Sequence, residues 1–362
     1  MIKHAYIHIP FCIRKCNYCS FVSGKNIQDK EPYLQALIKE IQIKYKQEKL
    51  KTLYIGGGTP SLLSPKDVEI LISLFNFEEN PEITIEINPE TITKEKANGY
   101  VYSGVNRASL GVQTFDNNIL KLIGRKHTEK NILNAIETIK GSNINNISID
   151  LIYGLPTQTL EIFNNDINKA ISLDIQHLSS YGLKIEEGSF FYTHIPNNLP
   201  DDEAQAEMFL HLCKILKENN FEHYEISNFS KIGFNSKHNS SYWENKNYYG
   251  FGLNASGYEN NVRYRNTPNL EEYIKNPFTR EEETTLSAQE IKEEEIFLAL
   301  RLKKGLDITN FNKKYNTNFE KSYDKIIAKY SKLGLLEIKD GHCTLTKNGI
   351  LLSNDIMSEF LD

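Results

Sequence analysis

The stretch Pro10–Cys19, PFCIRKCNYC, contains three of the chain's five cysteines in a C-x₃-C-x₂-C spacing. Thiolates this close together suit an iron–sulfur cluster or a zinc ion. A structural zinc ion takes four protein ligands, and the other two cysteines, Cys213 and Cys343, lie in distant segments. Three thiolates on a cubane 4Fe–4S cluster leave one iron open to a small-molecule chelate. The spacing therefore favours a cluster over the alternatives, a partial zinc site or a chance grouping of cysteines.

The composition describes an ordinary globular protein of 362 residues, with 40% hydrophobic and 25% charged residues and a net charge of −5. That charge predicts no general attraction to nucleic acid or to anionic membranes. No apolar run approaches the roughly 20 residues that cross a bilayer, and Met1–Ile7 lacks the apolar core of a signal peptide. Because cluster thiolates also need a reducing compartment, we expect a cytoplasmic protein. The net charge predicts no nucleic-acid partner.

Strand-like runs recur along the first half of the chain and alternate with amphipathic stretches. Strands are predicted at Ala5–Ile9, Thr52–Ile55, Glu82–Ile87, Arg107–Val112, Ile147–Ile152 and His177–Leu183. Amphipathic stretches lie between them at 31–48, 93–101, 116–140 and 159–172. This alternation indicates parallel βα units. Because six units are too few for an eight-stranded barrel, the predicted fold is α/β, a partial, open (β/α)₆ barrel with its site at the C-terminal ends of the strands.

Three segments are predicted along the chain. Residues 1–227 form the barrel, and residues 228–280, rich in Asn, Gly, Ser and Tyr without periodicity, are predicted to be loops packed on it. Residues 281–362 begin with a Glu-rich run, interpreted as a solvated helix face, and contain the hairpin signal Asp340-Gly341 after helical stretches. They predict a small winged-helix-like α+β domain. Without a basic stripe, we expect it to be a structural or lid-like module.

Polar residues follow or interrupt several of the predicted strands. The run Gly56–Thr59 would let a ligand approach the backbone. Glu86 and Asp150 place carboxylates inside apolar runs, where an unpaired acid is costly. Gln113 and Arg125 add an amide and a guanidinium, which clamps carboxylates well. Each residue alone is compatible with a tight turn, an ordinary salt bridge or a hydrogen bond, but together they predict a site for a charged small molecule.

The chain resembles the oxygen-independent coproporphyrinogen III oxidase-like branch of the radical S-adenosylmethionine (SAM) proteins over nearly its full length. The matching stretches are YIHIPFCIRKCNYC, GGGTP, IEINPE, SLGVQTF, GRKH and IDLIYGLP. The resemblance implies a barrel of the radical SAM type and a 4Fe–4S cluster held by Cys12, Cys16 and Cys19, with SAM bound to the open iron. It also implies SAM contacts from Tyr6, Tyr18, Gly57, Gly58, Thr59, Glu86, Gln113, Arg125 and Asp150.

Within that branch, the sequence is more similar to the HemW-type haem chaperones than to the oxidases. The oxidases carry a further cysteine two residues after the third, where this chain has Phe21. The segment Lys237–Trp243, KHNSSYW, fits the H-N-x-x-Y-W element of the chaperones, and Ser180–Gly188 and Tyr224–Phe229 also match that subgroup. One departure is Ser256, which replaces the histidine of the subgroup's G-x-G-x-G-A-H-S pattern.

The resemblance implies a protein that binds haem and passes it to an acceptor protein, with an electron donor for the cluster. Any membrane contact is expected to be peripheral, through the acceptor. Oxidase activity is not expected, but two alternatives stay open: an oxygen-independent coproporphyrinogen III oxidase, or a radical SAM enzyme that acts on another substrate.

Residues 228–280 are the candidate haem region, with His238 as the candidate haem contact. A neutral imidazole ligates iron, and Tyr242 and Trp243 are suited to line a flat, apolar pocket. The alternative is a loop histidine that holds the backbone while Trp243 packs against the barrel.

Overall fold

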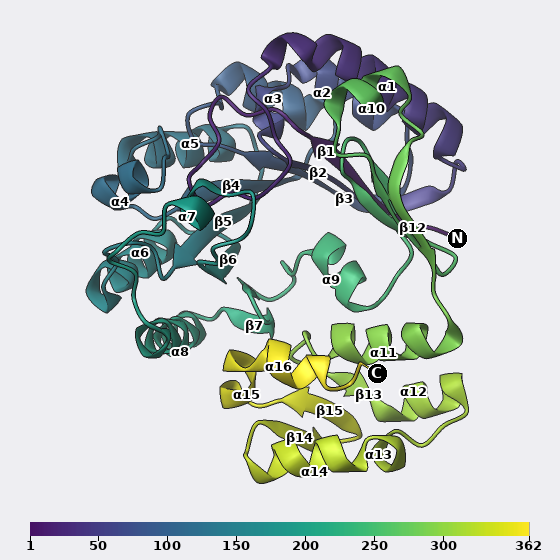
Figure 1. The fold of residues 1–362 in the computed structure, drawn as a ribbon. Helices are drawn as coiled ribbons and strands as arrows, with labels where there is room; N and C mark the ends of the chain where they lie inside the picture. The colour runs from purple at the N-terminus through teal and green to yellow at the C-terminus, as the bar shows by residue number, and fades with distance from the viewer. Residues whose placement is uncertain (362) are drawn as a thin grey trace.

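The computed structural model describes residues 1–361 and shows a mixed α/β protein built around one curved sheet (Figure 1). Nine strands pair in the order β7-β8-β6-β5-β4-β3-β2-β1-β9, so the sheet has two open edges. The strands expected from the sequence form its parallel centre: β1 (His4–Ile9), β2 (Lys49–Gly57), β3 (Asn76–Ile87), β4 (Arg107–Gln113), β5 (Asn146–Tyr153) and β6 (His177–Gly182). The α/β fold with an open parallel sheet is confirmed.

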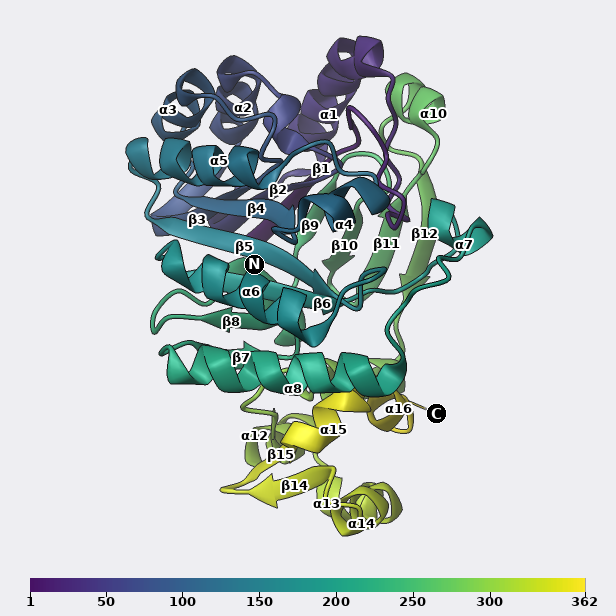
Figure 2. The same ribbon diagram turned by 90° about the vertical axis from the view of Figure 1, so that its left-hand side faces the viewer.

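Helices cover the convex side of the sheet, as Figures 1 and 2 show. They are η1 (Ile27–Asp29), α1 (Lys30–Lys44), η2 (Pro60–Leu62), α2 (Pro65–Ser73), α3 (Lys94–Tyr102), α4 (Asn117–Leu122), α5 (Glu129–Gly141) and α6 (Leu160–Ser172). The residue at which a helix begins is set by its capping residues. On α2, for example, Ser64 and Asp67 form a capping box and Pro65 takes the first helical position. The stretch 116–140 is two helices, because Asp116 caps the first and Thr128 begins the second.

Two short antiparallel strands extend the sheet beyond β6. After α7 (Phe190–Thr193) and α8 (Asp202–Glu218), β7 (Glu222–Glu225) turns back into β8 (Asn228–Ser230). The second of these pairs antiparallel with β6. This edge therefore ends the parallel run of βα units.

The prediction of loops over residues 228–280 is wrong. That segment contains β8, α9 (Lys237–Trp243), β9 (Tyr249–Phe251), β10 (Ser256–Glu259), β11 (Val262–Asn266) and α10 (Leu270–Lys275). Here β9 joins the main sheet in parallel with β1, while β10 and β11 form a second sheet with β12 (Arg280–Thr285). The Glu-rich run is thus strand first and helix only from α11 (Ala288–Ala299) onward. Strands of three to six residues are too short to show periodicity, and their partners lie far away in sequence.

The C-terminal residues form a separate hydrophobic core. Their elements are α11, β13 (Leu306–Asp307), α12 (Ile308–Tyr315), α13 (Phe319–Ser322), α14 (Asp324–Lys332), β14 (Leu336–Lys339), β15 (His342–Leu345), α15 (Lys347–Leu351) and α16 (Ser353–Ser358). Asp340 and Gly341, both at positive φ, form the expected two-residue turn between β14 and β15. The ion pair Arg263–Glu294 ties this part to the second sheet. The division of the chain at residues 227 and 280 stays a prediction.

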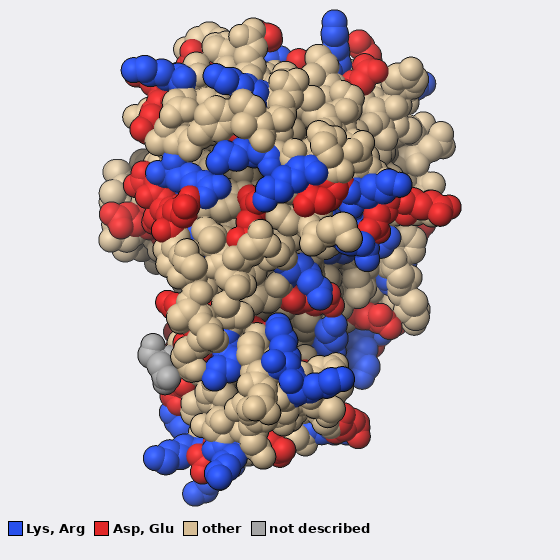
Figure 3. All heavy atoms as spheres, turned by 90° about the vertical axis from the view of Figure 1, so that its right-hand side faces the viewer, with Lys and Arg blue, Asp and Glu red and all other residues tan. Residues whose placement is uncertain are grey.

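Charge is mixed on one face of the molecule. On the face drawn in Figure 3, Lys and Arg side chains lie interspersed with Asp and Glu. None of the helices within residues 1–361 has the length and hydropathy needed to span a membrane.

Side chains on the two faces of the parallel sheet differ in kind. On β1, Ala5, Ile7 and Ile9 are fully buried on the convex side among the helices. The alternate positions carry polar or aromatic groups, and neighbouring strands match them in register: Tyr6 lies opposite Tyr54. The polar set on the concave side is His4, Tyr6, His8, Thr52, Tyr54, Glu82, Thr84, Glu86, Arg107, Ser109, Asn146, Ser148, Asp150, His177 and Ser179. The concave side therefore lines a polar space and is not a packed apolar core.

Glu40 of α1 holds the added strand β9 in place. Its carboxylate accepts hydrogen bonds from the Gly252 backbone N–H (2.8 Å), the Tyr273 hydroxyl (2.7 Å) and the Asn266 amide (2.9 Å). The residue is 3% exposed, and this burial raises the pKa of Glu40 to about 7. The carboxylate thus joins α1 to the end of β9, the end of β11 and α10 through three donors.

The substitution Glu40→Gln tests this junction. Both carboxylate oxygens face donors, so the amide group of Gln must oppose one of them. We expect a loss of about 1–3 kcal/mol in the free energy of unfolding, measured by urea denaturation. Glu31→Gln, at an exposed position of the same helix, is the matched control and should change stability by less than about 0.5 kcal/mol. Equal stability of the two variants would contradict this role.

Candidate functional site

The cysteine loop follows β1 directly and is fixed at both ends by backbone hydrogen bonds. Cys12 N–H donates to Gly24 O (2.9 Å), and Gly24 N–H donates to Pro10 O (2.8 Å). In its middle, the Asn17 backbone and side-chain amides donate to Ile123 O (3.0 Å) and Leu122 O (2.8 Å). All three cysteines, Cys12, Cys16 and Cys19, are free thiols that are partly exposed. The loop thus presents its thiols at the C-terminal ends of the strands, as the sequence predicts.

The glycine run at the end of β2 packs against this loop. A Cβ on Gly58 would lie 2.7 Å from Phe11 O and 3.0 Å from Cys12 Sγ, and Gly57 has φ +117°. The Thr59 hydroxyl lies 3.5 Å from Cys12 Sγ. Within residues 1–361, no three His, Cys, Asp or Glu side chains are gathered around one point suited to a single metal ion. The glycine backbone beside Cys12 is thus uncovered by side chains of its own, which leaves it open to a ligand.

Glu86 lies beside the glycine run on the concave side. Its carboxylate accepts the Gly57 N–H (2.9 Å) and the Tyr54 hydroxyl (2.9 Å). Burial and the nearby Asp150 carboxylate raise the pKa of Glu86 to about 7. Tyr6 lies on β1, on the other side of β2 from Glu86, and its hydroxyl is 3.0 Å from His8 Nδ1. The predicted contacts Tyr6, Gly57 and Glu86 are therefore brought together.

Asp150 lies on the same side, two strands away. The Ser109 hydroxyl donates to both of its oxygens (3.2 and 3.3 Å), and burial raises the pKa of Asp150 above its usual range. The residue remains half-buried, so its carboxylate is open to the concave space. It can accept hydrogen bonds from hydroxyl groups of a ligand.

Arg125 supplies the positive charge of the site. Its guanidinium donates to Asn88 Oδ1 (3.1 Å) and Gly111 O (3.3 Å), while its Nε is buried without a partner. Gln113 is buried nearby with φ +70°, a conformation that is unusual for a residue other than glycine. Tyr18 of the cysteine loop lies close enough to Arg125 to interact electrostatically. An unpartnered guanidinium nitrogen beside a strained amide suits an anionic ligand group.

His238 lies apart from the cysteine loop, deep on the concave side. Its Nδ1 is 2.7 Å from the Thr52 hydroxyl, and its Nε2 is 2.7 Å from the Tyr242 hydroxyl. The ring stacks on Tyr54 with centroids 5.1 Å apart, and the residue is 1% exposed. Because neither ring nitrogen is free, the expectation that His238 itself ligates haem does not fit this arrangement. The alternative of a histidine with a structural role fits better.

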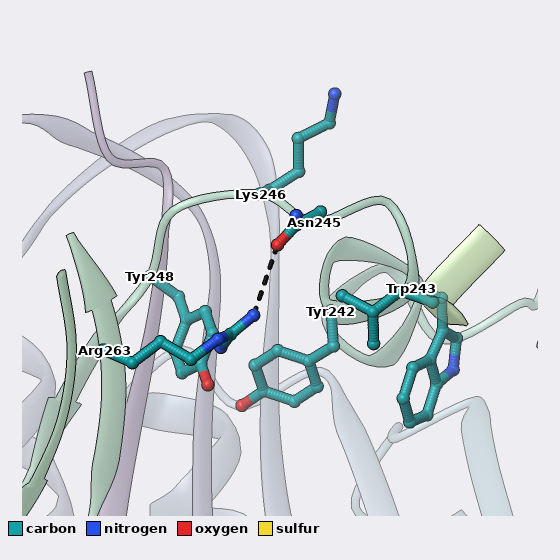
Figure 4. Close-up of a pocket in the computed structure, with 7 residues that line it drawn as sticks. Tyr242, Trp243, Asn245, Lys246, Tyr248 and Arg263 are labelled. Atoms are coloured by element: carbon teal, nitrogen blue, oxygen red, sulfur yellow. Dashed lines mark hydrogen bonds between the residues drawn. The ribbon is translucent and has the colours of Figure 1, made fainter. Parts of the chain in front are cut away.

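The rest of the KHNSSYW segment borders a pocket of about 260 Å³ (Figure 4). It is lined by Tyr242, Trp243, Asn245, Lys246, Tyr248, Arg263 and Leu298. The Trp243 ring lies under the Arg301 guanidinium at 4.3 Å, so it contacts the C-terminal part of the chain. The alternative stated from the sequence placed this ring against the barrel. Ser256, which replaces the family histidine, begins β10 with an exposed side chain.

Several residues of the concave side were missed from the sequence. Thr52, Tyr54, Asn88 and Ser109 each hydrogen-bond a predicted site residue or its ring, and Arg107 is 1% exposed among them. A usable signal existed, because polar residues recur at every second position of β2–β5 within otherwise apolar strands.

Comparisons with known proteins agree with this geometry. The radical SAM superfamily model matches residues 6–170, and the model of the HemN C-terminal domain matches residues 286–352. The haem chaperone HemW of Lactococcus lactis is 40% identical over 99% of this chain and 97% of its own length. HemW of Bacillus subtilis is 36% identical over 99% of both chains.

Among solved structures, the coproporphyrinogen III oxidase HemN from Escherichia coli has a TM-score of 0.88. It is 22% identical and covers 99% of this chain and 90% of its own, a likeness that concerns the fold alone. The haem chaperone relatives, in contrast, are similar in sequence from end to end. The chain therefore belongs to the HemW haem chaperone family of radical SAM proteins.

Proposed function

We propose that the protein is a haem chaperone that binds haem, a 4Fe–4S cluster and SAM, and that it transfers the haem to an acceptor protein. The proposal is carried by two features at one sheet, the cysteine loop beside the glycine run and the aromatic pocket at the KHNSSYW segment. Family membership over 99% of the chain supports it. The acceptor protein, the electron donor and the cytoplasmic location stay predictions.

In this proposal Cys12, Cys16 and Cys19 hold the cluster, which supplies a one-electron redox centre with one iron open to SAM. The three free thiols and the close approach of Gly58 to Cys12 support this assignment. The loop residues orient the thiols, because hydrogen bonds from Asn17 hold the loop against the end of α4.

The polar groups around the glycine run are proposed to bind SAM. Glu86 suits its α-amino group, Arg125 its carboxylate and Asp150 its ribose hydroxyls, because each offers the complementary charge or acceptor. The further proposed contacts are Tyr6, Tyr18, Gly57, Gly58, Thr59 and Gln113.

The pocket at the KHNSSYW segment is proposed to bind haem as cargo. Its aromatic side chains Tyr242, Trp243 and Tyr248 suit a flat, apolar ring system. Lys246 at its rim supplies a cation for a haem carboxylate, whereas the Arg263 charge is already paired with Glu294. His238 does not line this pocket, but its hydrogen bond to the Tyr242 hydroxyl holds that lining side chain in place.

The cluster assignment predicts the effect of Cys16→Ala. Loss of one of three thiolate ligands should abolish the broad visible absorption of the anaerobically reconstituted protein, measured together with its iron content. Cys213→Ala is the matched control, since that thiol lies on α8 away from the loop, and its spectrum should match the wild type. An unchanged spectrum for Cys16→Ala would refute the ligand assignment.

The SAM assignment predicts a pH-dependent affinity. Burial raises the pKa of Glu86 to about 7, and only its ionised form attracts an ammonium group, so SAM binding must release a proton below that pH. SAM affinity should fall as the pH drops from about 7 to 5, by up to about tenfold per pH unit. Calorimetry measures the SAM affinity at each pH.

Glu86→Gln should bind SAM at least tenfold more weakly at pH 8 and lose this pH dependence. Glu69→Gln, at an exposed site on α2, is the control and should behave as the wild type. A pH profile that survives in Glu86→Gln would assign the titration to another group and remove Glu86 from the site.

The alternative function is oxidation of coproporphyrinogen III. In place of the oxidases' further cysteine, this chain has Phe21, which is 65% exposed. We expect no conversion of coproporphyrinogen III by anaerobic protein with reconstituted cluster, SAM and a reductant, assayed by product fluorescence. Clear turnover would replace the chaperone proposal with the oxidase.

A further inference from the structure

A chain of hydrogen bonds runs from the edge of the sheet to the pocket. His4 Nδ1 lies 2.9 Å from the Thr52 hydroxyl, which lies 2.7 Å from His238 Nδ1. His238 Nε2 in turn lies 2.7 Å from the Tyr242 hydroxyl. His4 is half-buried, whereas His238 is fully buried, so the chain links an accessible imidazole to the pocket wall.

His238 is held too firmly to leave this position. Its backbone N–H donates to Glu82 Oε1 (2.9 Å), and its ring stacks on Tyr54. Both ring nitrogens are engaged by Thr52 and Tyr242. A haem iron could bind a nitrogen of this ring only by displacing Thr52 or Tyr242.

Tyr242, in contrast, borders the pocket directly. Figure 4 shows its hydroxyl pointing toward that of Tyr248, below the Arg263 guanidinium. Within the part of the chain that the structure describes, the Tyr242 hydroxyl has one hydrogen-bond partner, His238 Nε2. The Tyr242 oxygen therefore keeps an acceptor site that no described residue fills.

The hydroxyl of Thr52 couples the tautomers of His4 and His238, so the chain runs in one of two directions. A threonine carries a single O–H, so it donates to one histidine and accepts from the other. When the Tyr242 O–H donates to His238 Nε2, the His238 proton lies on Nδ1 and is donated to Thr52, which then donates to His4 Nδ1. In this arrangement His238 and Thr52 each donate one hydrogen bond and accept one, His4 accepts from Thr52, and the phenol points its proton at a base.

We propose, on the basis of the haem binding proposed above, that Tyr242 is the protein ligand of the iron in ferric haem, and that His238 is a positioning residue that receives its proton. The phenol O–H bond breaks as the iron–oxygen bond forms, and the proton passes to His238 Nε2. Burial holds the pKa of His238 well below its usual range and lowers that of His4 to about 4, so the proton passes through Thr52 and half-buried His4 to solvent. The iron stays ferric and no electron moves. Tyrosine is an established axial ligand of haem iron in other proteins.

The chain contains a near copy of this arrangement that serves as a control. The Ser148 hydroxyl lies 2.7 Å from His177 Nδ1, and His177 Nε2 lies 2.8 Å from the Tyr224 hydroxyl. The Tyr224 oxygen, however, also accepts the Ser236 backbone N–H (3.2 Å), and it does not border the pocket. Tyr224 thus has the same base but no position from which to reach haem.

Ferric haem is titrated into the full-length protein, and the complex is studied by visible absorption and resonance Raman spectroscopy. The wild type should show the charge-transfer band and the phenolate vibrations of a tyrosinate-bound ferric haem. Tyr242→Phe should lose both signals and bind at least tenfold more weakly, whereas Tyr224→Phe should keep both. His238→Gln should keep the phenolate vibrations with reduced affinity, because the ligand remains but its base is lost.

The outcomes separate the ligand from the function. No haem binding by the wild type would overturn the proposed function itself. Haem binding with phenolate signals that survive in Tyr242→Phe, or that vanish instead in Tyr248→Phe, would overturn only the ligand assignment. Loss of haem in His238→Gln with wild-type spectra in Tyr242→Phe would make the histidine the ligand.

A comparison of ferric and ferrous haem binding by the wild type tests the same ligand without variants, which could misfold. A hard anionic oxygen prefers ferric to ferrous iron, so reduction of the bound haem with dithionite should lower its affinity at least tenfold. Equal affinity for ferric and ferrous haem would contradict a phenolate ligand.

Discussion

The alternation of side chains along β1–β6 is the constraint on which the rest of the structure depends. Successive residues of a strand point to opposite faces, so the convex face takes the apolar residues and the helices, and the concave face takes the polar ones. In closed eight-stranded barrels the interior is filled by branched apolar side chains. Here Thr84, Arg107 and Asn146 lie side by side in register, and each has a buried polar atom without a partner. Such a face needs water or a polar ligand to satisfy it.

Later segments of the chain partly cover this face. In Figure 1, α9 lies in the mouth of the curved sheet, between the barrel strands and the C-terminal helices. Its backbone is anchored to Glu82 of β3, and β9 then extends the sheet beside β1. The covering segment is therefore bound to the strands themselves, which explains why one sheet can support both the cysteine loop at its strand ends and the aromatic pocket beneath α9.

Much of this architecture could be predicted from the sequence because its determinants are local. The six parallel strands carry short apolar alternations, and the three cysteines are close in sequence. The strands and the cysteine site could therefore be predicted without knowledge of distant contacts. The strands β9 and β10 were missed because three or four residues carry no period, and each gains its conformation from a distant partner.

The environment of His238 was beyond local reasoning for the same reason. Its partners Thr52, Tyr54 and Glu82 lie on β2 and β3, more than 150 positions earlier in the chain. The sequence shows a histidine close to two aromatic residues, which suggests a haem ligand. It does not show whether other side chains already hydrogen-bond the ring nitrogens of that histidine. Only the fold shows that they are occupied, by Thr52 and by Tyr242.

The two proposed sites share a wall. The Tyr54 hydroxyl donates to Glu86 on the side of the glycine run, and the Tyr54 ring stacks on His238 on the side of the pocket. Any ligand that draws the Glu86 carboxylate toward itself competes with the Tyr54 hydroxyl for that acceptor. A displaced Tyr54 ring in turn alters the packing of His238, the residue that orients Tyr242. Because protein interiors are close-packed, a shift of the Tyr54 ring also moves the His238 ring that it contacts. One tyrosine thus contacts both the carboxylate beside the glycine run and the histidine that hydrogen-bonds Tyr242.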